Sequence, residues 1–119
     1  MENVSNMVPL ADLASEYWKL LRAYERLIHE SSPEKVNRLK SNYRNSERKL
    51  GVILEEQKLK IISYEERDYT PNLAVNVINV DEFENNEGLV IAQMLEPTVM
   101  HKEQVLKTGK AILKEKGEE

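Results

Sequence analysis

The sequence predicts an α+β protein in which an N-terminal helical hairpin precedes a small, mostly antiparallel β-subdomain. Residues 1–60 have helical apolar periodicity and contain one glycine, whereas residues 61–119 are β-branched, alternating and rich in turn residues. The charge changes at the same place, because the first 60 residues hold 11 basic and 9 acidic side chains and the remainder hold 6 and 12. We therefore expect a helical region over 1–60 and a β-subdomain over 61–119 that ends in a frayed tail.

The composition restricts the function classes. A chain of 119 residues is the size of one domain, and 32% charged with 6% aromatic residues is typical of long, solvated helices. A net charge of −4 gives no electrostatic reason to expect nucleic-acid or membrane binding. The first residues lack the basic start and apolar core of a signal peptide, and no apolar run approaches the roughly 20 residues that span a bilayer. We expect a cytoplasmic protein.

The first helix begins near Pro9, a residue tolerated in a first helical turn. Two apolar rows follow it, and together they are broader than a two-stranded seam needs, so the helix is expected to pack on more than one neighbour. The first row has heptad spacing and consists of Leu10, Ala14, Tyr17, Leu21, Tyr24 and Ile28. The second row consists of Leu13, Leu20 and Leu27.

The second helix is expected from Pro33 to about Gln57. Ser32 suits the N-cap and Pro33 the first helical position. Gly51 lies inside this pattern and indicates a close helix contact or a kink. We expect the two helices to form an antiparallel hairpin, which alone buries little and so requires a further partner.

The pattern of the second region, residues 61–119, predicts short strands. We expect strands over 59–64, 73–80, 88–95, 104–106 and 110–113, with an acidic loop before Gly88. The alternation changes phase near Asn76, which indicates a bulge or a helix-to-strand change there. Pro97 is expected to end the strongest strand. A β-subdomain of this size is too small to be robust alone, so it should pack on the helices or on a second chain.

The sequence contains no catalytic constellation of side chains. There is no cysteine, no phosphate-binding glycine motif and no alternating calcium-loop order of carboxylates. His29 is expected at a helix end, where its protonated ring favours the helix dipole, and His101 in a solvated turn. We therefore expect no enzyme, no metal, no cofactor and no small-molecule substrate, and a function carried out by surface contact.

Candidate contact residues lie near the end of the main strand. Met94, Val99 and Met100 cluster there, and methionine side chains adapt well to partner surfaces. The alternative is that these three side chains fill the small β core. Lys107 lies between short strands, where it could reach a partner carboxylate, and the alternative is an ordinary exposed lysine.

Four segments and the order of elements resemble the GrpE family, the nucleotide exchange factors of DnaK-type chaperones. The segment VLKTGKAIL at 105–113 is similar to the family's closing V-L-R-P-A-x-V-x-V, with Lys107 on its arginine and Gly109 on its small residue. GLVI at 88–91 resembles the family's G-T-V-V strand, and YTPNL at 69–73 its F-D-P-N-x turn. LKII at 59–62 resembles the G-V-x-x-I segment that precedes that turn.

The resemblance implies a cochaperone that binds the ATPase domain of a DnaK-type chaperone and promotes ADP release. It implies a homodimer joined by a four-helix bundle, with the first apolar row (Leu10, Ala14, Tyr17, Leu21, Tyr24 and Ile28) as its surface. The implied partner contacts are Met94, Val99, Met100 and Lys107, with Pro71 and Asn72 shaping the supporting turn.

The sequence departs from the family pattern at three places. The family's H-x-A after the Pro-Asn turn is replaced by Ala74-Val75-Asn76, its Gly-Phe or Gly-Tyr by Pro97-Thr98, and its arginine by Lys107, which lacks the planar fork. Because of these departures, a second interpretation of the function remains: a GrpE-derived structural or regulatory adaptor without exchange activity. A third reading is a catalytic protein that uses its carboxylates.

Overall fold

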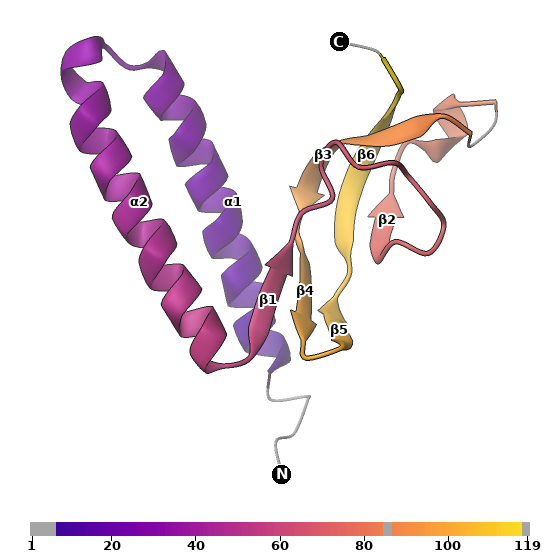
Figure 1. The fold of residues 1–119 in the computed structure, drawn as a ribbon, viewed down its shortest axis with the longest axis horizontal. Coiled ribbons are helices and arrows are strands. Elements are labelled where there is room, and N and C mark those ends of the chain that lie inside the picture. Colours follow the sequence, from indigo (N-terminus) through magenta and orange to yellow (C-terminus); the bar gives the residue numbers. More distant parts are fainter. Residues whose placement is uncertain (1–6, 85–86, 118–119) are drawn as a thin grey trace.

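The computed structural model describes residues 7–84 and 87–117. Two helices, α1 (Val8–Glu30) and α2 (Pro33–Glu56), form a hairpin that precedes two small sheets (Figure 1). The predicted α+β class with an N-terminal helical hairpin is therefore confirmed. Part of the predicted frayed tail, residues 118–119, lies outside the described residues. Within the described part of the chain, neither helix is long and apolar enough to cross a membrane.

The helices begin and end at the expected signals. Pro9 lies in the first turn of α1 and His29 in its last, and the Ser31 hydroxyl donates to the Leu27 carbonyl oxygen at 2.7 Å. Pro33 begins α2. A Cβ added at Gly51 would meet no atom within 4 Å, and α2 runs on to Glu56, so the expected close contact at this glycine is wrong.

Within the described residues, six strands form two three-stranded sheets. The first sheet has the order β1-β4-β5 and is antiparallel, with β1 (Leu59–Ile62), β4 (Thr98–His101) and β5 (Gln104–Lys107). The second sheet has the order β2-β6-β3, with β2 (Val75–Val77), β6 (Gly109–Glu115) and β3 (Leu89–Glu96). In it β3 runs antiparallel and β2 parallel to β6. A short 3₁₀ helix, η2 (Val80–Glu82), follows β2.

A bent ribbon joins the two sheets. Only Pro97 separates β3 from β4, and only Thr108 separates β5 from β6, so residues 89–115 form one long hairpin that changes sheet midway (Figure 1). Pro97 was expected to end the strongest strand, and β3 does end at Glu96. The chain continues directly into β4, because proline interrupts a ladder at a bend without preventing the next strand.

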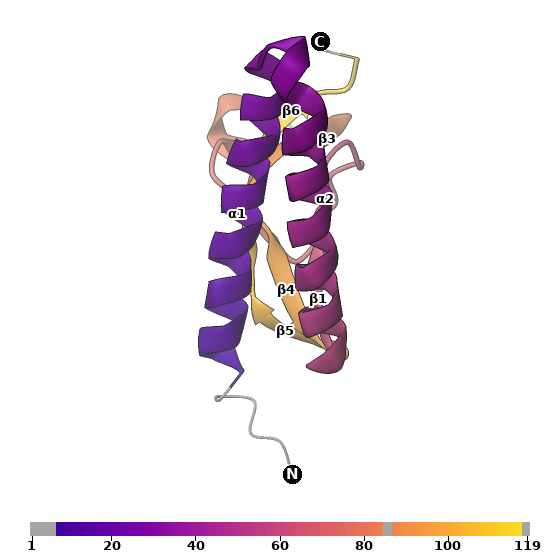
Figure 2. The same ribbon diagram turned by 90° about the vertical axis from the view of Figure 1, so that its left-hand side faces the viewer.

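The hydrophobic side chains form two clusters. In the first, the first sheet packs against the helices, and in Figure 2 both helices lie in front of β1, β4 and β5. Its buried members are Met7, Ala11, Ala14, Leu54, Leu59 and Val99. The second cluster lies in the second sheet, and its buried members are Tyr64, Leu89, Ile91, Met94, Ala111 and Leu113. The first sheet therefore rests on the helices, as its small size requires.

Candidate functional site

Two of the predicted contact residues belong to the cores. Met94 is 2% exposed inside the second cluster, and Val99 is fully buried between the first sheet and the helices. Neither side chain can contact a partner in this fold, which corrects their assignment as contact residues. Both strands are covered on the face that these residues occupy, so the alternative of a core role holds for both.

Met100 lies on the opposite face of the first sheet. Successive side chains of a strand point to opposite faces, and Val99 points to the helices, so Met100 points away from them. It pairs with Lys60 on β1 and Val105 on β5. Met100 is half-buried, Val105 is 38% exposed and Lys60 is exposed. We call Lys60, Met100 and Val105 the outer row.

The sequence reasoning missed two members of the outer row. Lys60 and Val105 stand opposite Met100 only through the register of the first sheet, and β4 was not expected as a strand. For Val105, the sequence offered one signal, the alternation in Gln104–Lys107. A two-residue period places Val105 on one face of the sheet and Leu106 on the other. That signal could not identify the face toward solvent.

His101 is in β4 and 5% exposed, so the expected solvated turn is wrong. It pairs with Leu59 and Gln104 in the first sheet. His29 is exposed at the end of α1, as expected. The two histidines therefore lie in different environments and do not form a joint site.

Lys107 already has a partner within the chain. Its Nζ atom lies 3.0 Å from Oδ1 of Asp12 on α1, and its side chain is 26% exposed. This ion pair fastens β5 to the helical hairpin. A partner carboxylate would have to compete with Asp12 for the same ammonium group.

Pro71 and Asn72 are exposed in the turn that leads to β2. The Thr70 hydroxyl donates to the Asn72 side-chain oxygen, and the Leu73 N–H donates to the Thr70 carbonyl at 3.1 Å. The turn is held to the bend of the ribbon by Thr98, whose hydroxyl donates to the Ala74 carbonyl at 2.5 Å. These hydrogen bonds fix the shape of the turn and its position against the bend of the ribbon.

The first apolar row of α1 packs within the chain. Ala14 and Ile28 are each 4% exposed, and Leu10, Tyr17, Leu21 and Tyr24 are half-buried. The rings of Tyr24 and Tyr43 on α2 stack with centroids 6.5 Å apart, and the Tyr17 hydroxyl donates to the Ser46 carbonyl at 3.3 Å. The assignment of this row to a dimer surface is corrected accordingly, because its side chains face α2 and the first sheet.

The second apolar row is exposed instead. Leu13, Leu20 and Leu27 are 64%, 70% and 59% exposed. Their seven-residue spacing places them on one side of α1. This row is an exposed apolar surface of the hairpin.

A polar joint connects the helical hairpin to the second sheet. One guanidinium nitrogen of Arg22 on α1 lies 2.9 and 3.0 Å from the two carboxylate oxygens of Glu65. The same carboxylate accepts the backbone N–H of Met94 in β3 at 2.8 Å. Arg22 also lies over the Trp18 ring, with its guanidinium carbon 5.0 Å from the centroid. These contacts fix the orientation of the helices relative to the ribbon.

The described residues hold little acid–base or metal chemistry. Within 7–84 and 87–117, no group of three or more histidine, aspartate or glutamate side chains is placed to hold a metal ion. Burial raises the pKa of the Tyr43 hydroxyl to about 12, and the Glu47 and Glu25 carboxylates act in the same direction. That phenol is therefore protonated at neutral pH, when it cannot serve as a base.

Comparisons with protein-family models, curated proteins and solved structures find no match to this chain.

Proposed function

We propose that this protein is a GrpE-like cochaperone that binds the ATPase domain of a DnaK-type chaperone and promotes ADP release. The observation that carries the proposal is the rigid connection between a helical hairpin and a bent β ribbon, made by the Arg22–Glu65 joint and the Lys107–Asp12 pair. The proposal includes a homodimer and a cytoplasmic location.

The segment similar to the family's closing motif supports this reading. Residues 105–113 run through β5, the bend and β6, and Gly109 occupies the motif's small position. A Cβ there would lie 2.7 Å from the Glu96 carbonyl oxygen, so the bend requires glycine. The small residue of this motif therefore has a structural role in this fold, because Gly109 allows the ribbon to pass from the first sheet to the second.

The proposed mechanism is thermodynamic linkage. A chaperone with a closed nucleotide cleft holds ADP more tightly than one with an open cleft, so a protein that binds only the open form lowers the affinity for ADP. A coupling free energy of about 1–3 kcal/mol corresponds to a change in affinity of roughly five- to 150-fold. The outer row of Lys60, Met100 and Val105 is the surface that we assign to the chaperone, because it combines exposed apolar atoms with a rigid support.

Release of fluorescently labelled ADP from a DnaK-type chaperone, followed by stopped flow, tests the proposal. We expect saturating protein to accelerate release by roughly five- to 150-fold, and Val105→Asp to remove most of this effect. Val52→Asp on α2, also at an exposed valine, is the matched control and should leave the rate unchanged. No acceleration by the native protein would refute exchange activity.

The adaptor without exchange activity is the second candidate. It is favoured by Lys107, which replaces the family's arginine and is paired with Asp12 within the chain. An adaptor that still recognises the chaperone would bind it without changing the ADP release rate. Measuring complex formation with the chaperone alongside the ADP release rate separates the two functions, because an adaptor would form the complex and leave the release rate unchanged.

A further inference from the structure

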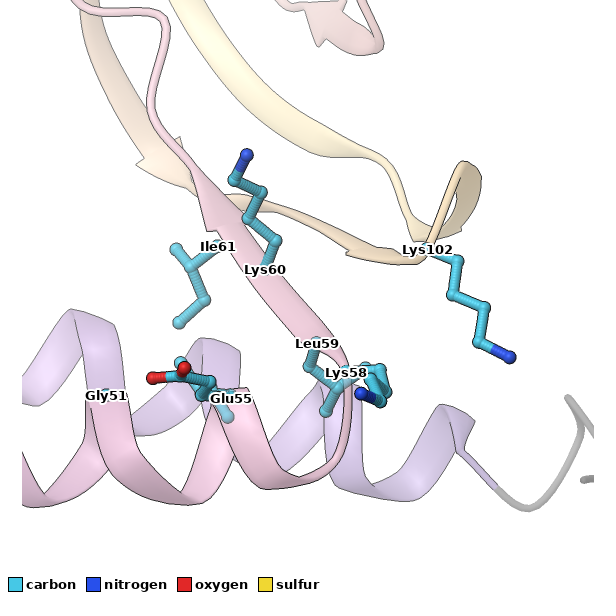
Figure 3. Close-up of a pocket in the computed structure, with 8 residues that line it drawn as sticks. Gly51, Glu55, Lys58, Leu59, Lys60, Ile61 and Lys102 are labelled. Atoms are coloured by element: carbon cyan, nitrogen blue, oxygen red, sulfur yellow. The ribbon is translucent and has the colours of Figure 1, made fainter.

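An apolar groove lies between the end of α2 and β1. Its volume is about 530 Å³, and its apolar floor is formed by Leu54, Leu59 and Ile61, of which Leu54 and Leu59 are 9% and 6% exposed. Figure 3 shows Ile61 directed from β1 toward α2. Gly51 leaves the wall of α2 open, because a Cβ at this position would meet nothing within 4 Å.

The groove runs beside an open sheet edge. In the first sheet β1 is an edge strand, and among the residues that the structure describes it pairs only with β4. The Lys102 N–H donates to the Lys58 carbonyl at 3.3 Å, one residue before the ladder in which Leu59 stands opposite His101. Hydrogen-bonded and non-hydrogen-bonded pairs alternate in an antiparallel ladder, so the backbone groups of Leu59 and Ile61 point away from β4. These groups can pair with an added strand.

Lysine side chains surround this edge. Lys58, Lys60 and Lys102 line the groove and are exposed, together with one carboxylate, that of Glu55 near the end of α2. Within residues 7–84 and 87–117, none of the three forms an ion pair, whereas Lys107, Lys114 and Lys116 each have an acidic partner. Lys58 and Lys102 also adopt left-handed backbone angles, with φ of 61° and 57°, where glycine would be less strained.

The same charges disfavour a second copy of this chain as the occupant. An antiparallel pairing of β1 with β1 of another molecule, centred on Lys60, would place the two Lys60 side chains directly opposite each other. Like charges at facing positions destabilise a strand pair. A strand that carries carboxylates opposite Lys60 would instead be stabilised by the attraction between unlike charges.

We propose that the open edge of β1 and its groove form a docking site for an extended segment of a partner protein in which apolar and acidic residues alternate. The segment adds to the first sheet as a strand beside β1. Its apolar side chains enter the groove on the α2 side, where Ile61 points. Its carboxylates lie on the other face with Lys60, which extends away from α2 in Figure 3. This site does not depend on the proposed exchange activity.

A fluorescein-labelled synthetic peptide in which valine and aspartate alternate tests the proposal by fluorescence anisotropy at low salt. Three comparison peptides serve as controls: one with lysine in place of aspartate, one with the same composition in scrambled order, and one with alternate amides N-methylated. We expect binding of the first peptide only, because the lysine peptide is repelled, the scrambled one loses the two-face pattern and the methylated one cannot pair with the edge. Absence of binding by the first peptide, or equal binding of all four, would overturn the docking site and leave Lys60 as a guard against edge-to-edge association.

Two pairs of variants locate the binding. Lys60→Glu should weaken binding roughly tenfold or more, whereas Lys35→Glu, the same charge change at an exposed site on α2, should not. Gly51→Leu should close the groove and weaken binding similarly, whereas Gly51→Ala should not. Unchanged affinity in Lys60→Glu contradicts the site even if Gly51→Leu fails to fold. A normal ADP release rate in Gly51→Leu that no longer binds the peptide would show that docking and exchange are separate functions, because Gly51 lines the groove and is not part of the outer row.

Discussion

Gly109 lies at the bend where β5 continues into β6. A Cβ at this position would lie 2.7 Å from the Glu96 carbonyl oxygen and 2.8 Å from the Thr98 hydroxyl oxygen. The glycine N–H donates to that same hydroxyl at 3.1 Å, so the oxygen cannot move away without losing a hydrogen bond. The absence of a side chain at Gly109 therefore permits the close approach of the two strands.

Gly109→Ala is expected to lower the free energy of unfolding by about 1–3 kcal/mol, as overpacking of a filled interior does. Urea denaturation followed by circular dichroism measures this change. Gly51→Ala is the matched control, since its added methyl group meets no other atom and removes a glycine from a helix. That control should gain about 0.5–1 kcal/mol. An unchanged midpoint for Gly109→Ala would mean that the bend tolerates a shift of the backbone.

The roles of single residues were only partly predictable from the sequence. The exposure of Pro71 and Asn72 follows from turn chemistry, which is local. The burial of Met94 and the pairing of Lys107 with Asp12 depend on which distant element comes to lie opposite them. A methionine in a strand has the same sequence pattern whether its face is covered or open, so its contacts were not determined by its neighbours in sequence.

At the scale of elements, both helices and the long strand β3 were predictable because each has a periodic pattern and clear end signals. The strand β4 was not, since it has only four residues and follows Pro97 directly. The prediction of which apolar row of α1 stays exposed was also wrong, because the first row packs within the chain and the second is exposed. Both rows have seven-residue spacing, and the small residues Ala11 and Ser15, now fully buried, were the signal for the face that approaches the sheet closely.

The joint between α1 and the second sheet depends on one carboxylate. Glu65 is 20% exposed and accepts hydrogen bonds from Arg22 and from the Met94 backbone. Glu65→Ala removes all three of these hydrogen bonds and leaves the Met94 N–H without this acceptor. We expect a loss of about 1.5–3 kcal/mol in the free energy of unfolding, as for hydrogen bonds to charged groups.

Thermal and urea unfolding of Glu65→Ala and Glu66→Ala together test this joint. Glu66 is the adjacent control, because its pair with Lys114 is 69% exposed on the glutamate side. Such an exposed pair contributes about 0–1 kcal/mol. Equal effects of the two substitutions would show that Glu65 is an ordinary surface carboxylate and that the helices are held to the sheet by apolar contacts alone.

At the scale of the whole molecule, the fold is flat, with Cα extents of 49 × 45 × 16 Å. The helical hairpin and the β-subdomain lie side by side in this plane (Figure 1). The first sheet and the first apolar row account for one side of α1, and the row of Leu13, Leu20 and Leu27 remains uncovered. Three leucines at one side of a helix, each more than half exposed, are the apolar side chains of α1 that a second copy of the chain would cover.

The homodimer in the proposed function should therefore form through this second row. In a two-fold symmetric interface each substitution acts twice, so Leu20→Asp places two carboxylates in the centre of the contact. We expect the native protein to sediment as a dimer and Leu20→Asp as a monomer in equilibrium ultracentrifugation. Circular dichroism should show the same helix content for both, because Leu20 is 70% exposed in the single chain.

Val52→Asp provides the control for this assignment. Val52 is 48% exposed and lies two residues from the buried Leu54, or about 200° around α2. It belongs to neither apolar row of α1, so Val52→Asp should leave a dimer formed through the second row intact. Dissociation by both substitutions would indicate a general effect of added negative charge, and a native protein that is monomeric at all concentrations would remove the four-helix bundle from the proposal. Neither outcome would change the result expected in the ADP release test, because the outer row lies on the face of the first sheet that is turned away from the helices.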